Sequence, residues 1–395
     1  MKTLYLHIGT QKTGTTSIQS FCGDNAAVFE KKGYCYPIFP YKYPRVVKER
    51  NGHFLVGAVK DEKGQIFEGE DKKIFEDGMK RVADLFLQYD NVVLSDEHIW
   101  RNTFERRKSL WEELKKHGEE NGYRVQIIVY LRRQDQYAIS LWNQTVKTSV
   151  TKAGAKRFDE YIENVPKVYQ LDYYKKLESI AKVLGKDAIT VRRYERDHFY
   201  GGSIYADFLH AINLELTDDF KIVRGDRNFG LQGNTHEIKR VLNSLPEMLD
   251  ADVNHFFRQT LLSISQTSAK EYQTSMLSAE ETEEFMQKYE EGNQAIAREY
   301  LKEDGTELFH TEVTSLPKWT KDNPYMQDDL IRFVGVSAIH LLEENRKIQE
   351  ENRKIKEELK QMKDELAKVR SFQNKLKHPF RTLGQMIRRK FGSQK

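Results

Sequence analysis

The part of the sequence best equipped to bind an anion is its first seventeen residues. The apolar stretch 4–8 is expected to form a buried strand, and it runs into a segment rich in glycine and hydroxyl groups, Gly9-Thr10-Gln11-Lys12-Thr13-Gly14-Thr15-Thr16-Ser17. Apolar residues at near-helical spacing follow, which is typical of the strand, loop and helix that begin an open parallel sheet. Backbone N–H groups converge where such a helix begins, and the helix dipole adds partial positive charge. The segment therefore predicts a phosphate-binding loop.

The position of the lysine in this loop limits the phosphate chemistry that it can serve. The spacing from Gly9 to Gly14 and Thr16 approaches that of a Walker A loop, but a Walker A loop has lysine directly after its second glycine, where this sequence has Thr15. Lys12 precedes Gly14 and would approach a phosphate chain from the front of the loop. Because short motifs also arise by chance, a glycine and threonine turn with an exposed lysine is the alternative.

Three ionisable residues end a second apolar stretch. The stretch 91–98 is expected to be a strand that ends in Asp96, Glu97 and His98. The carboxyl ends of parallel strands face the ligand crevice of an open sheet, so these groups should lie across from the loop. One of them could act as a general base, or Asp96 could hold magnesium in a kinase or ATPase. The alternative is that Asp96 and Glu97 only cap the next helix.

An arginine and a serine eight residues apart follow a third predicted strand, 125–131. The guanidinium of Arg132 can bind two oxygens of one phosphate at the strand end, and the following helix would bring the hydroxyl of Ser140 to the same phosphate. Arg133 is more simply explained as a member of an ion pair. The pair of Arg132 and Ser140 thus predicts a second phosphate site beside the loop.

Together these segments resemble sulfotransferases that use 3′-phosphoadenosine 5′-phosphosulfate (PAPS). The 5′-phosphosulfate loop of that family is usually written Pro-Lys-Ser-Gly-Thr-Thr, and its positions are taken here by Gln11, Lys12, Thr13, Gly14, Thr15 and Thr16, with Ser17 next. The family binds the 3′-phosphate with an Arg and a Ser at the spacing of Arg132 and Ser140, although its usual proline after the arginine is Gln134 here. The resemblance covers about the first 310 residues and extends to bacterial polysaccharide-associated homologues through 293–301.

The resemblance implies roles for these residues. Heparan-type carbohydrate sulfotransferases place a catalytic Glu just after the second strand, so Glu97 is expected to be the base, with His98 and Asp96 as substitutes. Lys12 would neutralise the leaving oxygen, and no metal is required. A late loop, 227–233, would close over the cofactor with Arg227 and Asn228. The expected activity is sulfuryl transfer from PAPS to a carbohydrate hydroxyl. The alternatives are a P-loop kinase or NTPase with a degenerate Walker A loop, and a coiled-coil scaffold that keeps a nucleotide fold only for binding.

The elements that must position these groups define an α/β fold, a P-loop-type parallel sheet flanked by helices. Helices are expected over 74–87, 171–184, 204–212, 236–249, 253–264 and 279–301, a short strand over 34–37 and a fourth strand over 188–191. The stretch up to residue 73 lacks periodicity and is expected to form loops, where His53, Tyr41, Tyr43 and Phe54 could face a ligand.

Composition bounds the remaining possibilities. The 395 residues are 38% hydrophobic and 31% charged with a net charge of +4, which fits a large globular domain and gives no indication of nucleic-acid binding. Cys22 and Cys35 have neither disulfide-framework nor zinc-ligand spacing, which favours a reducing compartment. No signal peptide and no apolar run of membrane-spanning length are visible. A cytoplasmic location is expected.

The C-terminal part has a different pattern. A tandem heptad, 344–350 and 351–357, begins a stripe of apolar residues, with Asn345 and Asn352 at a positions and Ile348 and Ile355 at d positions. This predicts a coiled-coil homo-oligomer, and the buried amides favour a parallel dimer. After Pro379 an amphipathic basic tail could contact an anionic membrane at its inner face. The expected organisation is a catalytic domain, 1–310, a linker, 311–335, a coiled coil, 336–378, and the tail, 379–395.

Overall fold

The computed structural model describes residues 1–44, 46–58, 68–105, 107–149, 151–223, 230–302, 307–311, 316–377 and 379–391. The chain forms two compact units, Met1–Met326 and Gln327–Lys395. The first unit carries all of the described residues that the sequence singles out for catalysis or phosphate binding.

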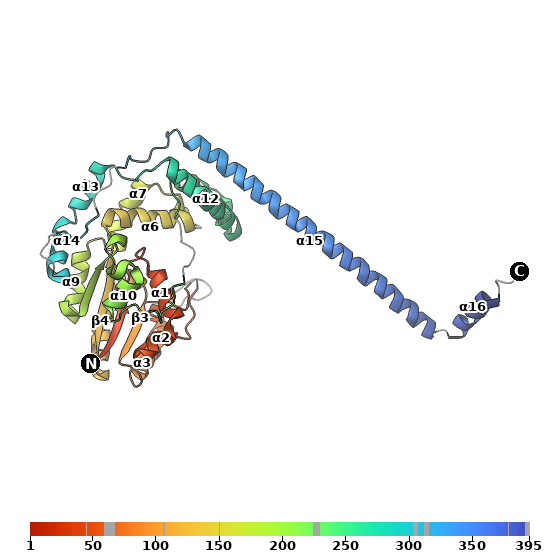
Figure 1. Cartoon of the computed structure of the whole chain (residues 1–395), viewed down its shortest axis with the longest axis horizontal. Helices are drawn as coiled ribbons and strands as arrows, with labels where there is room; N and C mark the ends of the chain where they lie inside the picture. Colours follow the sequence, from red (N-terminus) through yellow and green to blue (C-terminus); the bar gives the residue numbers. More distant parts are fainter. Residues whose placement is uncertain are drawn as a thin grey trace. The chain divides into compact units, whose positions relative to one another are not determined.

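The first unit is built on a five-stranded, all-parallel sheet with strand order β2-β3-β1-β4-β5 (Figure 1). The strands are β1 Lys2–His7, β2 Tyr34–Cys35, β3 Asn91–Ser95, β4 Tyr123–Leu131 and β5 Ile189–Arg193. The central strand is β1, in which Leu6 lies between Leu94 of β3 and Ile127 of β4. The α/β class and the parallel sheet predicted from the sequence are confirmed.

Helices cover both faces of this sheet because apolar side chains alternate along its strands. Leu4, Leu6 and Ile8 belong to one core cluster, which contains residues of α3 Glu68–Leu85, α5 Leu110–Asn121 and α9 Tyr173–Leu184. Tyr5 belongs to the other cluster, which contains residues of α1 Thr15–Asp24, α2 Ala26–Lys31 and α10 Ile204–Ala211. Parallel strands buried on both faces typically contain runs of apolar residues, as β1 does over residues 4–6 and β4 over residues 127–131.

Further helices complete the first unit. The helix α6, Gln134–Thr148, begins directly after β4 and packs on α11 Thr235–Leu242 and α12 Ala251–Glu271. The remaining elements of this unit are α4 His98–Glu105, α7 Phe158–Ile162, α8 Val165–Tyr169, α13 Ala279–Gln287, α14 Glu290–Ile296, a π-helical turn η7 Ala297–Leu301, and short 3-10 turns at His53–Leu55, Lys152–Ala155, Lys186–Ala188, Arg196–His198, Tyr200–Gly202 and Pro246–Leu249.

Two helices are shorter than the sequence pattern predicts. The helix expected over 236–249 ends at Leu242, and a separate 3-10 turn begins at Pro246, because proline cannot continue a helix that needs its N–H. The helix expected over 279–301 is divided after Gln287, next to Tyr289, which packs against the core. Helix α9 ends at Gly185 as predicted and is capped by Asp172, whose side chain accepts a hydrogen bond from the backbone of Lys175.

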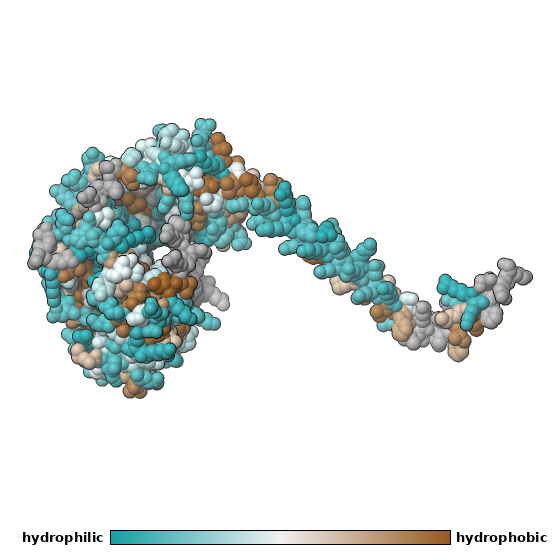
Figure 2. Space-filling model, in the orientation of Figure 1, coloured by the Kyte–Doolittle hydropathy of each residue, from teal (hydrophilic) through white to brown (hydrophobic). Residues whose placement is uncertain are grey.

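The second unit consists of two helices, α15 Met326–Lys377 and α16 Pro379–Phe391. The linker expected over 311–335 is therefore helical from Met326 onward. At a rise of about 1.5 Å per residue, the 52 residues of α15 span about 78 Å. Figure 2 shows that the surface of α15 is largely hydrophilic, with apolar residues spaced along it. Within the described part of the chain, no helix is both long enough and apolar enough to cross a membrane.

Candidate functional site

The loop that follows β1 is tied to the end of β4. The backbone N–H of Thr10 donates to the carbonyl of Tyr130 at 2.9 Å, and the N–H of Tyr130 donates to the carbonyl of Gly9 at 2.7 Å. The hydroxyl of Thr13 donates to the carbonyl of Thr10 and closes the turn. Gly14 has a left-handed conformation, with φ 76°, and a Cβ atom there would lie 2.4 Å from Ile204. The loop is thus held in one compact conformation beside the neighbouring strand.

The start of α1 presents its first N–H groups at this loop. Its N-cap is Gly14, which has no side chain to accept hydrogen bonds from the first turn. Thr15 is buried, whereas Thr16 and Ser17 are exposed, and Gln11 is half-buried. A helix start without a side-chain cap is a favourable place for an anion, because the ligand can accept the hydrogen bonds that a capping residue would otherwise accept.

Lys12 lies at the front of the loop among other cations. Its Nζ atom donates to Oε1 of Gln144 on α6 at 3.1 Å, and its carbonyl accepts a hydrogen bond from the guanidinium of Arg132 at 3.3 Å. Burial, together with the charges of Lys147 and Arg132, lowers the pKa of Lys12 to about 8, and Glu97 partly opposes this effect. No ion pair joins Lys12 to a carboxylate of the described residues. Its charge is therefore left available to a ligand.

The two arginines after β4 have different environments. The guanidinium of Arg133 donates two hydrogen bonds of 2.7 Å to Asp135 and a third to the carbonyl of Thr311, which makes it structural, as expected. Arg132 lies over the ring of Tyr194 at 5.7 Å, and its buried Nε atom has no partner. Burial lowers the pKa of Arg132. A buried cation with an unpaired donor is costly unless a ligand supplies an acceptor.

Ser140 is half-buried on α6 and precedes Gln144, the partner of Lys12, by one helical turn. Residues four apart share a face of a helix, so Ser140 belongs to the same side of α6 that meets the loop. Arg132, the loop and this face of α6 are accordingly brought together. Arg227 and Asn228, which were expected to close over the cofactor, lie outside the described residues.

The two acidic residues after β3 have different environments: the carboxylate of Asp96 is fully hydrogen-bonded, whereas that of Glu97 has a free oxygen. Asp96 is completely buried, and its oxygens accept hydrogen bonds from Nε and an Nη of Arg50 at 2.9 and 3.0 Å and from the backbone N–H of His98 at 2.7 Å. His53 Nδ1 lies 2.9 Å from the same carboxylate. Hydrogen bonding from His53 and the charge of Arg50 outweigh burial and hold the pKa of Asp96 below its usual value. Asp96 therefore has no vacant oxygen with which to take a proton.

Glu97 has the opposite environment. Its Oε2 atom is buried without a hydrogen-bond partner, and Oε1 lies 3.8 Å from Arg50. The residue is packed against the loop, since a Cβ atom on Gly9 would lie 3.2 Å from its Cα. Of the two acids, Glu97 is thus the one with a free oxygen next to the loop. Of the substitutes, His98 begins α4, and burial lowers its pKa to about 4, so it is neutral at physiological pH.

His53, Asp96 and His98 also have ligand atoms within 4.8 Å of one another, a spacing compatible with a metal ion. A metal would have to displace the guanidinium of Arg50, which already binds both oxygens of Asp96. The cluster is better explained as an ion-pair network that fixes the segment around residues 50–55 against β3. Phe54, which was considered a ligand contact, is instead buried in the core.

Three residues that the sequence analysis missed contribute to the site. Arg50 contacts both acids, and Gln144 and Lys147 extend the face of α6 that begins with Ser140. The spacing of four and seven residues from Ser140 is a signal that could have identified the last two. The side chain of Arg50 lies in a segment without periodicity, and no pattern in the sequence points to it.

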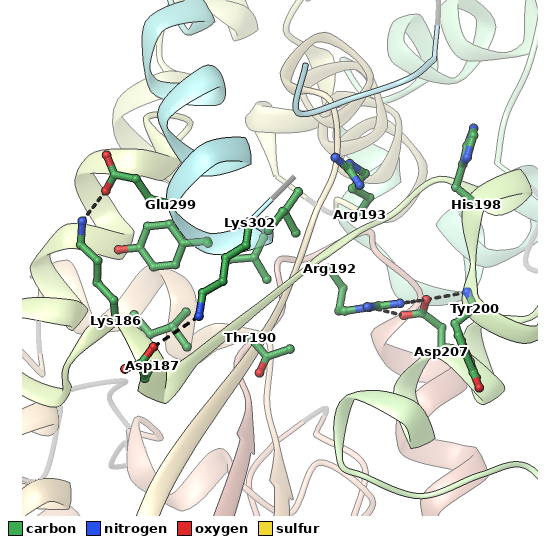
Figure 3. Close-up of a pocket in the computed structure, with 14 residues that line it drawn as sticks. Lys186, Asp187, Thr190, Arg192, Arg193, His198, Tyr200, Asp207, Glu299 and Lys302 are labelled. Atoms are coloured by element: carbon green, nitrogen blue, oxygen red, sulfur yellow. Dashed lines mark hydrogen bonds and ion pairs between the residues drawn. The ribbon is translucent and has the colours of Figure 1, made fainter. Parts of the chain in front are cut away.

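A cavity of about 560 Å³ lies elsewhere, along the edge strand β5 and the turn η7 (Figure 3). Its charged side chains are largely paired with one another: Lys186 with Glu299, Lys302 with Asp187, and Arg192 with Asp207. This pairing contrasts with the unpaired charges at the loop after β1. The cavity therefore offers little for the recognition of a charged ligand.

Comparisons with known proteins give one distant relative. A protein of Archaeoglobus fulgidus, described as an uncharacterized protein, is 26% identical over 180 residues, which is 44% of this chain and 45% of that protein. The match thus spans less than half of the relative's length. No protein-family model matches the chain, and no solved structure matches it significantly. The function has to be argued from the site itself.

Proposed function

We propose that the chain is a PAPS-dependent sulfotransferase that transfers a sulfuryl group to a hydroxyl of a carbohydrate. The observation that carries the proposal is the meeting of three groups at one sheet edge: an uncapped helix start with a lysine that has no carboxylate partner among the described residues, an arginine with an unpaired donor, and a carboxylate with a free oxygen. These are the groups needed for a 5′-phosphosulfate, a second phosphate and an acceptor hydroxyl. The loop is proposed to be of the P-loop type.

The residues present fit the cofactor. The N–H groups at the start of α1 and the hydroxyls of Thr15, Thr16 and Ser17, with Gln11 and Thr13 alongside, would hold the 5′-phosphosulfate. Arg132 and Ser140 would hold the 3′-phosphate, for which Arg132 has an unused donor. PAPS supplies the sulfuryl group when it is bound.

Glu97 and Lys12 would carry the chemical step. The free oxygen of Glu97 takes the proton of the acceptor hydroxyl as that oxygen forms its bond to sulfur. Lys12 stabilises the negative charge that develops on the bridging oxygen of the 5′-phosphate when the sulfur–oxygen bond breaks. Arg50, which lies between Asp96 and Glu97, holds the carboxylate of Glu97 near the loop. His98, neutral and next in sequence, is available as a secondary proton acceptor.

A P-loop kinase or NTPase remains the alternative. It would need Asp96 or a similar carboxylate as a magnesium ligand. Because Asp96 already accepts hydrogen bonds from Arg50 and lies beside His53, magnesium would compete with a buried guanidinium for the same oxygens. This competition favours the metal-free sulfuryl transfer. The carbohydrate acceptor rests on the resemblance of the motif at Glu97 to heparan-type enzymes.

The proposal extends to assembly as a homodimer through α15. The apolar a and d positions of its heptads are exposed in the single chain, and they include Ile348, Ile355, Leu359, Met362, Leu366 and Val369. Arg353 forms ion pairs with Glu350 and Glu357 at 2.7 Å, on the side of the helix away from this stripe. An apolar stripe of this length is buried by pairing with a second copy. Sedimentation of the full chain against an Ile348→Lys variant tests the pairing.

The proposal also includes peripheral membrane contact from the cytoplasmic side through α16. Exposed Leu383, Met386 and Ile387 accompany the basic residues Arg388 and Arg389 on this short helix. Each basic residue near an anionic surface adds about 1 kcal/mol of attraction. Sedimentation with anionic and neutral vesicles separates this contact from nonspecific adsorption.

The activity is tested by thermal shift with adenosine 3′,5′-bisphosphate, ATP and ADP, each with and without magnesium. A sulfotransferase is stabilised by the bisphosphate without magnesium, whereas a kinase is stabilised by ATP or ADP with magnesium. Transfer of labelled sulfate from PAPS to a panel of oligosaccharides then tests the reaction. Stabilisation only by ATP with magnesium would reject the sulfotransferase in favour of the kinase.

A further inference from the structure

The strand β5 forms one edge of the sheet, and on its outer side no strand of the described residues pairs with it. The N–H of Tyr194, the residue after β5, donates to the carbonyl of Leu131 on β4 at 2.7 Å. The backbone groups of successive residues in a strand point to opposite sides, so Arg192 also faces β4. By the same alternation, Val191 and Ile189 direct their backbone N–H and C=O groups to the outer side of the sheet.

These outward backbone groups have hydrogen bonds to offer. Within the part of the chain that the structure describes, no group bonds to the N–H or C=O of Ile189 or Val191 on the outer side. Both residues have little contact with solvent, since they are only 5% and 3% exposed. A backbone polar group that is shielded from water and has no partner raises the energy of the fold. A ligand that supplies the missing partners is therefore favoured at this edge.

The cavity of about 560 Å³ follows this edge (Figure 3), and all five residues of β5 line it. On the side of the sheet where Val191 joins the core, the cavity is bounded by Tyr300 and Leu301 of η7. On the opposite side it is bounded by Arg192 and its ion-pair partner Asp207 of α10. At about 3.3 Å per residue, the strand edge within the cavity is about 17 Å long. We call this cavity the edge groove.

The charged side chains of the edge groove bind one another or backbone carbonyls. The ion pairs are Lys186 with Glu299, Lys302 with Asp187, and Arg192 with Asp207. The guanidinium of Arg193 donates to the carbonyls of Leu308 and Glu307. A charged occupant would have to compete with these contacts. The matching occupant instead has neutral hydrogen-bonding groups at the spacing of a strand, which is the chemistry of an extended polypeptide.

We propose that the edge groove binds an extended segment of a partner protein, which adds a strand to the sheet beside β5. Strand addition of this kind takes its affinity from main-chain hydrogen bonds and its specificity from side chains at alternate positions. One face of the added strand would meet Tyr300 and Leu301, and the other would meet the ion pair of Arg192 and Asp207. The partner segment is thus expected to alternate apolar and polar, uncharged residues. This interaction goes beyond the proposed function and does not depend on it.

Fluorescence anisotropy tests the proposal with the full chain and a labelled, blocked hexapeptide of alternating valine and threonine. The same peptide methylated at every backbone nitrogen cannot donate main-chain hydrogen bonds and should bind about 10-fold more weakly or not at all. Val191→Pro removes the outward N–H and no bond to β4, so it should weaken binding of the unmethylated peptide about 10-fold or more. Val191→Ala keeps this N–H and is the matched control, which should bind the peptide as the wild-type chain does.

Hydrogen exchange on the wild-type chain keeps the test decisive if Val191→Pro does not fold. Bound peptide should slow exchange of the Val191 amide, whereas the Tyr194 amide, which already bonds to Leu131, should exchange slowly with or without peptide. Equal binding of the methylated and unmethylated peptides, or binding of neither, would overturn the proposal. Slow exchange of the Val191 amide without peptide, in proportion to chain concentration, would assign the edge to a second copy of the chain and would also overturn it.

Discussion

Gly9 and Glu97 approach so closely that a Cβ atom on Gly9 would lie 3.2 Å from the Cα of Glu97. Gly9 also has φ 108°, a conformation that residues with a side chain rarely adopt. The loop after β1 and the carboxylate after β3 are thus positioned against each other through their backbones. The distance between the proposed phosphate site and the proposed base depends on this contact.

Gly9→Ala should lower the rate of transfer about 10-fold or more, since the added methyl separates the loop from Glu97. The matched control is Gly33→Ala, which has a similar left-handed φ of 79° but no atom within 4 Å of the new Cβ. Both variants should lose about 1–2 kcal/mol of folding stability from backbone strain. Transfer kinetics and urea unfolding measure the two effects. Equal activity of the two variants would show that the contact has no part in the reaction.

Glu97→Gln and Asp96→Asn should have opposite effects. Glu97→Gln removes the proton acceptor and should reduce turnover about 100-fold or more, with little change in stability or bisphosphate affinity. Asp96→Asn weakens a buried charged contact with Arg50 and should destabilise the fold by about 2 kcal/mol. Single-turnover rates and urea unfolding separate the two. A stable Asp96→Asn variant with no activity would instead make Asp96 the base.

Binding of adenosine 3′,5′-bisphosphate should weaken as pH rises through about 8. The pKa of Lys12 is lowered to about 8 in the free chain by burial and neighbouring cations, and a bound anion would raise it. Below this pH Lys12 is protonated in both the free and the bound chain, so its contribution to the affinity is constant. Above this pH the free chain loses the proton, and the affinity falls. Calorimetry between pH 7 and 9 measures the effect, which Lys12→Arg should abolish. A pH dependence that Lys12→Arg leaves unchanged would belong to another group.

Arg132→Ala and Arg133→Ala should separate binding from folding. Arg132→Ala should weaken adenosine 3′,5′-bisphosphate by about 2 kcal/mol and leave adenosine 5′-phosphate nearly unaffected. Arg133→Ala should mainly lower stability, because it leaves the buried Asp135 without its partner. Ser140→Ala should follow Arg132→Ala with a smaller loss. Equal losses for both nucleotides in Arg132→Ala would remove its assignment to the 3′-phosphate.

Lys176→Met should stabilise the chain by on the order of 2 kcal/mol at pH 7. Lys176 is 4% exposed, its ammonium donates to Thr103, and burial lowers its pKa from 10.5 to about 8. Burying the charged ammonium therefore destabilises the folded state at pH 7. Between about pH 8 and 10.5 the folded chain has lost this proton and the unfolded chain has kept it, so the free energy of unfolding of the wild-type chain rises with pH. The gain from the substitution should shrink over that range. Urea unfolding measures the effect, with Lys175→Met at an exposed position as the control. An equal gain in stability in both variants would contradict the prediction.

The sequence predicted those parts of the site that follow local patterns. Each of the three segments consists of an apolar strand that runs directly into polar residues, and the parallel sheet brings their ends to one edge. The choice between Asp96 and Glu97 could not be predicted, because the two are adjacent and chemically alike. The hydrogen bonds that Asp96 accepts from Arg50 and His53, 46 and 43 residues away, distinguish it from Glu97. The segment that holds Arg50 has no periodicity, so its packing against β3 left no pattern in the sequence.

The boundaries of the helices could likewise be predicted only where a local residue marks them. Helix α9 was predicted closely because Gly185 marks its end locally. The division of 279–301 at Tyr289 depends on the packing of that ring against the core, which helical periodicity does not reveal.

The central position of β1 also governs the order in which the site can form. Its neighbours β3 and β4 follow it by roughly 90 and 120 residues. At a synthesis rate of about 5–20 residues per second, this apolar strand emerges from the ribosome on the order of 10 s before β4 does. Thr10 and Gly9 cannot bond to Tyr130 until then. Because contacts of such long sequence separation form slowly, the loop should acquire its ligand-binding geometry late in folding. Until then the apolar strand β1 is unpaired, which makes it a natural target for a chaperone.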